Sequence, residues 1–177
     1  MLKALDSKNL KVRFIRLGEG NSYAKHCIDN SVSILGFWSG EEAILPSCVS
    51  NDWDVVKEFL IKKRTVQKNG IPPRSVADDL RQVKEFFSDQ NGETIWITLY
   101  EGHMYWALSD SNNYMPIPFD TTIRCSRHMT TPWSRKTLTG KSLAILDLNE
   151  SVAKLQGYRG TICAVRDPEH VIRLIKA

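Results

Sequence analysis

Residues 94–109 read TIWITLY-EG-HMYWALS, the clearest hairpin pattern in the chain. Two runs rich in β-branched and aromatic residues flank Glu101-Gly102, which we interpret as a two-residue hairpin turn. With that turn, one face of the hairpin is wholly apolar and holds Ile95, Ile97, Leu99, Met104, Trp106 and Leu108. The other face is mixed and holds Trp96, Thr98, Tyr100, His103, Tyr105 and Ala107. We therefore expect Trp106 in a core, and room beside the ring of Trp96.

Around this hairpin the sequence predicts short strands and helices that do not alternate as βαβ units. Strand patterns occupy residues 11–17, 32–38 and 121–126. Helical patterns begin at Ser22 and Ser75, each read as an N-cap, and further helices are expected over residues 52–64, 150–156 and 168–175. The pattern is typical of an α+β fold, with a small curled sheet or open β-barrel flanked by helices.

Length and composition bound the class of protein. A chain of 177 residues with 42% hydrophobic and 25% charged residues fits one domain, residues 1–177, with a real core. No apolar run approaches the ~20 residues that span a bilayer, and residues 1–14 lack the apolar region of a signal peptide. The four cysteines are scattered without a CxxC pair. Reduced thiols and a cytoplasmic location are expected, with no membrane partner.

Positive charge is concentrated in one segment. The net charge is +4, and residues 121–146 hold no acid. Five cations lie there, namely Arg124, Arg127, Arg135, Lys136 and Lys141. Such a segment is either a solvated basic loop or a surface for a polyanion.

Motifs for catalysis or metal binding are not found in the sequence. Cys125 and His128 form a lone C-x2-H pair without a second pair, which argues against zinc. A phosphate loop and a nucleophile elbow are both missing. The sequence therefore predicts no catalytic residue, no cofactor and no metal site.

Two tryptophans have two interpretations each. Trp38 ends the apolar run of residues 34–38 and is followed by Ser39-Gly40, so it is either the last core residue or the floor of a pocket. Trp133 lies inside the basic segment. It either plugs the end of the sheet or stacks on a base while the cations neutralise phosphates.

A family resemblance favours the second interpretation of both tryptophans. Three stretches carry it: KVRFIRLGEGNSYAKHCIDNSVSILGFWSG, DDLRQVKEFFSDQNGETIWITLYEGHMYWAL and WSRKTLTGKSLAILDLNESVAKLQGYRGTIC. They resemble the EVE family of PUA-like domains, which are related to YTH domains and occur in modification-dependent restriction endonucleases. The resemblance spans most of the chain and implies a small β-barrel with helices on its flank.

The resemblance also implies a binding site. Such domains flip a modified base, or take it from a single strand, and hold it in an aromatic cage. Trp38 matches the cage tryptophan, followed by the small polar Ser39, and Trp133 resembles a second wall. Trp96 is a third candidate, and Asn21 and Ser22 would contact the edge of the base. The nucleic-acid backbone would be held by the basic residues Arg124, Arg127, Arg135, Lys136 and Lys141.

The implied function is a reader of DNA with a flipped methylated or hydroxymethylated cytosine, or methylated adenine. A nuclease or motor domain is not visible in this chain, so the reader would be the specificity module of a restriction system and work with such a partner. The alternative is an RNA-binding PUA-like module acting on modified or structured RNA, and a nuclease with an unrecognised active site is a third possibility. Fold resemblance does not fix the ligand.

Overall fold

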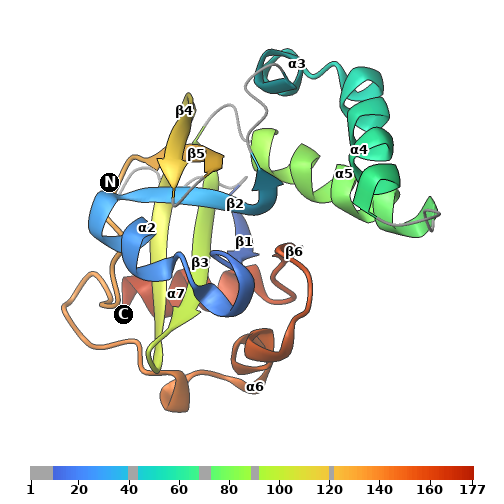
Figure 1. The fold of residues 1–177 in the computed structure, drawn as a ribbon. Helices are drawn as coiled ribbons and strands as arrows, with labels where there is room; N and C mark the ends of the chain where they lie inside the picture. Colours follow the sequence, from blue (N-terminus) through green and yellow to red (C-terminus); the bar gives the residue numbers. More distant parts are fainter. Residues whose placement is uncertain (1–9, 40–43, 68–72, 89–91, 120–121) are drawn as a thin grey trace.

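The computed structural model of the chain describes residues 10–39, 44–67, 73–88, 92–119 and 122–177. For residues 36–39, 66–67, 73–74, 110–113, 115–119 and 122–125 it describes the backbone alone. The fold is α+β, as predicted, and its sheet is curled into a half-barrel with helices around it (Figure 1).

The sheet has six strands in the order β2-β5-β4-β3-β1-β6. Their bounds are β1 Lys11–Ile15, β2 Val32–Ser39, β3 Thr94–Tyr100, β4 His103–Phe119, β5 Thr122–Met129 and β6 Ile162–Ala164. The β1–β3 pair is parallel, and the other neighbours are antiparallel.

The predicted hairpin is confirmed in detail. Leu99 pairs with Met104 and Trp96 with Ala107, which is the register of a two-residue turn. Glu101 and Gly102 have φ angles of 45° and 75°. Left-handed conformation at both central residues is the type I′ geometry that matches the twist of the strands.

The long strand β4 causes the sheet to curl. Its first part, from His103 to Leu108, pairs with β3, and its last part, from Tyr114 to Phe119, pairs with β5. The register with β5 shifts between Ser109 and Tyr114. Such an irregularity increases local twist, so β4 carries the sheet from one half of the barrel to the other.

Helices and helical turns connect and cover the strands. Their bounds are η1 Glu19–Asn21, α2 Ala24–Asn30, α3 Leu45–Val49, α4 Trp53–Gln67, α5 Pro73–Phe87, η3 Ile145–Asp147, α6 Glu150–Ala153, η4 Lys154–Gly157 and α7 Pro168–Lys176. Both predicted N-caps are wrong. Tyr23 precedes α2 without a side-chain cap, and α5 begins two residues before Ser75. Figure 1 shows α4 and α5 side by side, extending away from the sheet.

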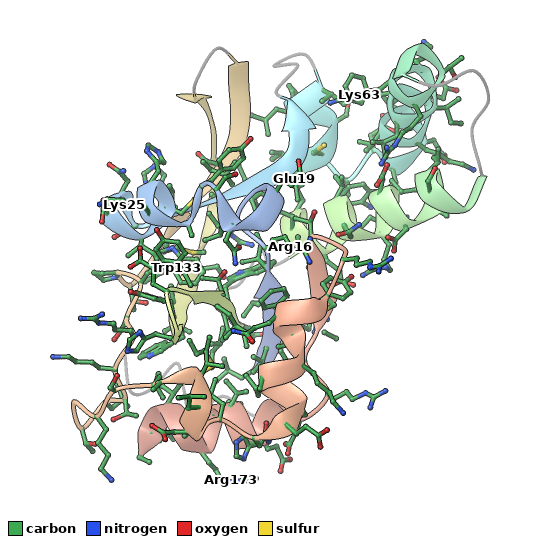
Figure 2. The ribbon with its side chains drawn as sticks, turned by 60° about the horizontal axis from the view of Figure 1, so that its bottom comes forward. Arg16, Glu19, Lys25, Lys63, Trp133 and Arg173 are labelled. Carbon is green, nitrogen blue, oxygen red and sulfur yellow. The ribbon has the colours of Figure 1, made fainter. Side chains whose placement is uncertain are left out.

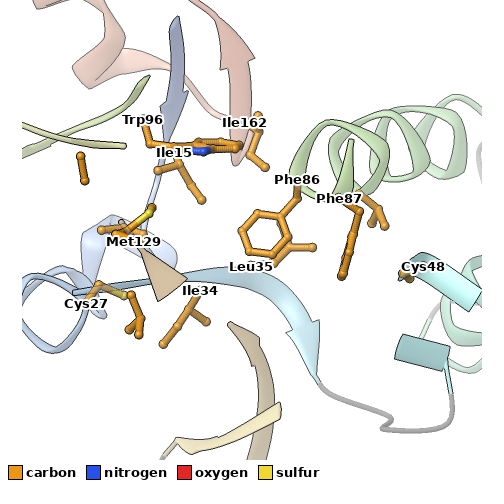
Figure 3. Packing of buried hydrophobic residues seen from close by; sticks show 14 of the residues in the cluster. Ile15, Cys27, Ile34, Leu35, Cys48, Phe86, Phe87, Trp96, Met129 and Ile162 are labelled. Atoms are coloured by element: carbon orange, nitrogen blue, oxygen red, sulfur yellow. The ribbon is translucent and has the colours of Figure 1, made fainter. Parts of the chain in front are cut away.

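One core fills the concave side of the sheet. Trp96, Ile15 and Leu35 from the strands meet Phe86 and Phe87 from the C-terminal end of α5 (Figure 3). The mixed face of the hairpin lies here. Because the curled sheet and the helices enclose this side, most of the mixed face is buried, and Tyr100 and His103 are half-buried.

A second core lies on the other side of the sheet. The wholly apolar face of the hairpin is buried there, together with Val12 and Phe14 of β1. Val171 and Ile175 of α7 cover it, as does Val152 of α6. Trp106 is buried in this core, as predicted, and donates through Nε1 to the Lys136 carbonyl (2.8 Å).

Polar side chains of α5 attach this helix to the edge strand β6. The Gln82 Oε1 atom accepts from the backbone N–H groups of Thr161 (2.6 Å) and Ile162 (2.8 Å). Glu85 pairs with Arg13 of β1 at 3.0 Å. The two Gln82 bonds satisfy backbone N–H groups at the start of this edge strand, and the Glu85–Arg13 pair ties α5 to β1. In the part of the chain that the structure describes, no helix is long and apolar enough to cross a membrane.

Candidate nucleic-acid interface

The C-terminal end of β2 brings two predicted site residues to neighbouring positions. Ser39 of β2 is the register partner of Arg124 on β5, after an irregularity that follows Ile34. Trp38 comes directly before Ser39 on the same strand. The structure does not describe the side chains of Trp38, Ser39 and Arg124, so the roles predicted for these three residues remain predictions.

Trp133 is buried at the opposite end of β2. Its side chain is 6% exposed, and its indole Nε1 donates to the Val32 carbonyl at 2.8 Å. Trp38 comes six residues after Val32 on the same strand, beyond the irregularity between Ile34 and Ser39. The burial of Trp133 and its bond to Val32 favour the other interpretation of this residue, a plug at the end of the sheet. The structure does not describe the Trp38 side chain, so the pairing of the two tryptophans as facing walls stays a prediction.

Trp96 does not provide an exposed wall. Its ring is 0% exposed and meets Phe86 at an interplanar angle of 60°, with ring centroids 6.1 Å apart. The prediction of its partner Ala107 is confirmed, but the space beside the ring is filled by α5. The sequence predicted room beside the Trp96 ring because its face of the hairpin is mixed. The curled sheet and α5 close over that face, so the ring is buried.

Asn21 is engaged in holding its own loop. Its Oδ1 accepts from the Leu17 N–H (2.9 Å), and its Nδ2 donates to the Leu99 carbonyl (2.7 Å). With both ends of the amide occupied, Asn21 is a scaffold residue rather than a reader of a base edge. Ser22, the next residue, is exposed.

Arg127 is wrong as a phosphate contact. Its side chain is 0% exposed, and Nη1 donates to the Phe86 carbonyl of α5 (3.0 Å). The guanidinium also lies over the Tyr114 ring, 5.0 Å from its centroid. A cation at the C-terminal end of a helix is stabilised by the orphan carbonyls and the helix dipole, so this charge serves the fold.

Three predicted cations, Arg135, Lys136 and Lys141, are exposed. They lie on a small hairpin over residues 134–143, defined by the bridge between Lys136 and Ser142. We call this the basic hairpin. Within the described ranges none of the three has an ion-pair partner. Their charges are therefore available to a polyanion.

The basic hairpin is attached to β4 beside two tyrosines that the sequence reasoning did not select. Ser134 bridges Trp106, and Ala144 bridges His103, so the intervening Tyr105 lies on the attached segment. The ring of Tyr105 lies 6.4 Å from that of Tyr100, which is half-buried. Both tyrosines belong to the mixed face of the β3–β4 hairpin, and this alternation was the signal that could have found them.

Thiol and metal chemistry receive no support from the described side chains. Burial raises the pKa of Cys27 and of Cys48 to about 12, and that of Cys163 to about 11. Thiols with such pKa values stay protonated at neutral pH and are poor nucleophiles. Among the side chains that the structure describes, no group of three His, Cys, Asp or Glu residues could hold a metal ion.

Comparisons with known proteins assign no relative to this chain. No family model matches it, and neither a curated protein nor a solved structure matches it significantly.

Proposed function

We propose that this chain is an EVE-type, PUA-like reader that binds DNA and takes a flipped modified base. The base is a methylated or hydroxymethylated cytosine, or a methylated adenine. The chain supplies specificity, and a nuclease or motor domain supplies the response. The α+β half-barrel is compatible with this family, and the resemblance in sequence supports the choice of ligand.

The observation that carries the proposal is the unpaired charge of the basic hairpin. Arg135, Lys136 and Lys141 lie close together in sequence on one bonded hairpin, with Lys136 opposite Ser142. Exposed cations without carboxylate partners neutralise phosphates and release counterions, which favours binding to nucleic acid of any sequence. The half-buried Tyr100 adds aromatic surface of the kind on which bases stack, whereas Tyr105 is 8% exposed and packs in the first core.

We propose that the modified base is held at the C-terminal end of β2. Trp38 would stack on the base, and Ser39 and Arg124, which are register partners, would contact its edge and the adjoining phosphate. Trp133 has a different role in this proposal, since its bond to the Val32 carbonyl fixes the start of the same strand. Stacking selects for a base, whereas the basic hairpin holds the backbone.

Binding of purified protein to matched duplexes, with and without the modified base, tests the proposal. We expect R135E/K136E to weaken binding to both duplexes alike, and to lower the slope of log K against log salt by about 2. We expect Trp38→Ala to keep the salt slope and lose selectivity, by about 5- to 150-fold if stacking contributes ~1–3 kcal/mol. With magnesium present, the bound duplex should stay intact.

The matched control is K57E/K62E, which makes the same change in charge on exposed positions of α4. Equal loss of binding in the control and in R135E/K136E would show a net-charge effect and refute the basic hairpin as the contact. Tighter binding to structured or modified RNA than to any DNA duplex would replace the DNA reader by the RNA-binding module.

A further inference from the structure

A hollow of about 380 Å³ lies where β1 meets the loop that follows it. Its lining residues come from β1, η1, β3 and η4 and from the residue after β1, namely Phe14, Arg16, Gly20, Asn21, Leu99 and Gln156. Neither the end of β2 nor the basic hairpin contributes a residue. The hollow is therefore a separate site from the one proposed above.

The floor of the hollow is apolar and firmly held. Phe14 and Leu99 both belong to the second core. The Phe14 ring meets the Tyr158 ring edge to face, with an interplanar angle of 85° and centroids 6.1 Å apart. A floor packed in this way keeps its shape whether or not a ligand is present.

The loop of residues 18–21 forms one wall, and its backbone is fixed in shape. Gly18, Gly20 and Asn21 all have positive φ angles, of 86°, 59° and 62°. A Cβ on Gly18 would come within 2.8 Å of the Tyr23 ring, so glycine is required there. At Gly20 a Cβ would meet nothing within 4 Å, which means that the backbone faces open space. The Asn21 amide ties this wall to the segment after β1 through Leu17 and to β3 through Leu99.

Arg16 places a positive charge at the hollow. One of its N–H groups donates to the Arg159 carbonyl at 3.3 Å. In the described part of the chain the guanidinium has no carboxylate partner, so most of its five N–H donors are available. Gln156 adds an exposed side-chain amide. Figure 2 labels both Arg16 and Glu19, and of these two Arg16 alone lines the hollow.

We propose that this hollow binds a phosphate group of a nucleotide. The planar guanidinium of Arg16 matches two phosphate oxygens, and the Gln156 amide can donate to a third. Phe14 and Leu99, which are 2% and 5% exposed, fix the shape of the floor and offer little apolar surface of their own. The phosphate can belong to a free nucleotide or to the backbone of a strand, and both have this chemistry.

Nuclear magnetic resonance titration of the full chain tests the site with three probes: inorganic phosphate, deoxycytidine monophosphate and a short single strand of DNA. We expect saturable shifts of the backbone amides of Gly18, Gly20 and Asn21. Arg16→Ala should weaken binding about tenfold or more, because hydrogen bonds to charged groups contribute ~1.5–3 kcal/mol. Arg16→Lys should recover part of it, since a lysine keeps the charge and loses the fork.

Arg159→Ala is the matched control, because it removes an exposed arginine beside the hollow and leaves the carbonyl that accepts from Arg16. Tighter binding of the mononucleotide than of the strand assigns a free nucleotide, and the reverse order assigns backbone phosphate. The proposal is overturned if no probe shifts the loop amides, or if Arg16→Ala binds as well as the control. R135E/K136E must leave phosphate binding unchanged, so this result is independent of the function proposed above.

Discussion

Three buried side chains place polar atoms in the interior without a hydrogen-bond partner in the structure as described: Ser33 Oγ, Trp96 Nε1 and Thr98 Oγ1. Trp96 and Thr98 are two residues apart on β3, so they share the concave side of the sheet. A buried hydroxyl without a partner costs ~1–3 kcal/mol relative to its hydrated state. These three side chains are therefore well packed, but their polar atoms lack hydrogen-bond partners.

Thr98→Val tests this view at the scale of one residue. Valine has nearly the same shape and no hydroxyl, so we expect the free energy of unfolding to stay constant or to rise by about 1 kcal/mol. Urea denaturation followed by tryptophan fluorescence measures it. Thr131→Val is the control of opposite sign, because the Thr131 hydroxyl accepts from the Leu108 N–H at 2.9 Å. A loss of stability in Thr98→Val as large as in the control would mean that the Thr98 hydroxyl has a partner after all.

At the scale of elements, side chains of β4 and β5 bond the end of α5 to the barrel. The last two carbonyls of α5, those of Phe86 and Phe87, lie 3.3 and 3.1 Å from the Tyr114 hydroxyl. Arg127 donates to the first of them. Residues of β4 and β5 thus act as the C-cap of a helix that is remote in sequence.

We expect Arg127→Met to destabilise the protein by about 1–3 kcal/mol, since methionine keeps the apolar stem and leaves the Phe86 carbonyl with only the longer bond from the Tyr114 hydroxyl. Hydrogen exchange should become faster along α5 first. The same substitution at exposed Arg135 should change stability by less than about 0.5 kcal/mol. If Arg127→Met instead retains full stability and loses DNA binding, the original role as a phosphate contact is restored.

The β3–β4 hairpin was predictable and the role of Arg127 was not, for a physical reason. The register of the hairpin follows from the alternation of residues around Glu101-Gly102. A slip by one residue would move the apolar side chains to the opposite face, so the long apolar face fixes the register. Arg127 stands in an equally local pattern of polar residues, but its partner is the Phe86 carbonyl, 41 positions earlier. The same holds for Trp133, whose partner at Val32 is 101 positions away. The charge of an arginine or the ring of a tryptophan does not indicate which distant carbonyl it will bond.

At the scale of the whole molecule, one sheet separates two cores, and β3 contributes to both. Ile95 and Ile97 face the second core, while Trp96 between them faces the first. The candidate interface is only partly predictable for a related reason. Curling of the sheet encloses Trp96 and Arg127, which the sequence placed on the surface, and leaves Arg135, Lys136 and Lys141 exposed.

Because β3 and β4 are shared, we expect the two cores to unfold together. Ile34→Ala removes packing from the first core and Ile97→Ala from the second, and each should cost about 2–5 kcal/mol. If the chain is one cooperative unit, each variant lowers hydrogen-exchange protection equally in α7 and in β2, although each element touches only one of the substituted cores. Circular dichroism and tryptophan fluorescence should give the same denaturation midpoint.

A variant that loses protection only in its own core, or two separate transitions, would show that the half-barrel and the α7 layer are independent units. Because alternate side chains of β3 are anchored in opposite cores, this strand cannot release one core without losing the backbone that holds the other.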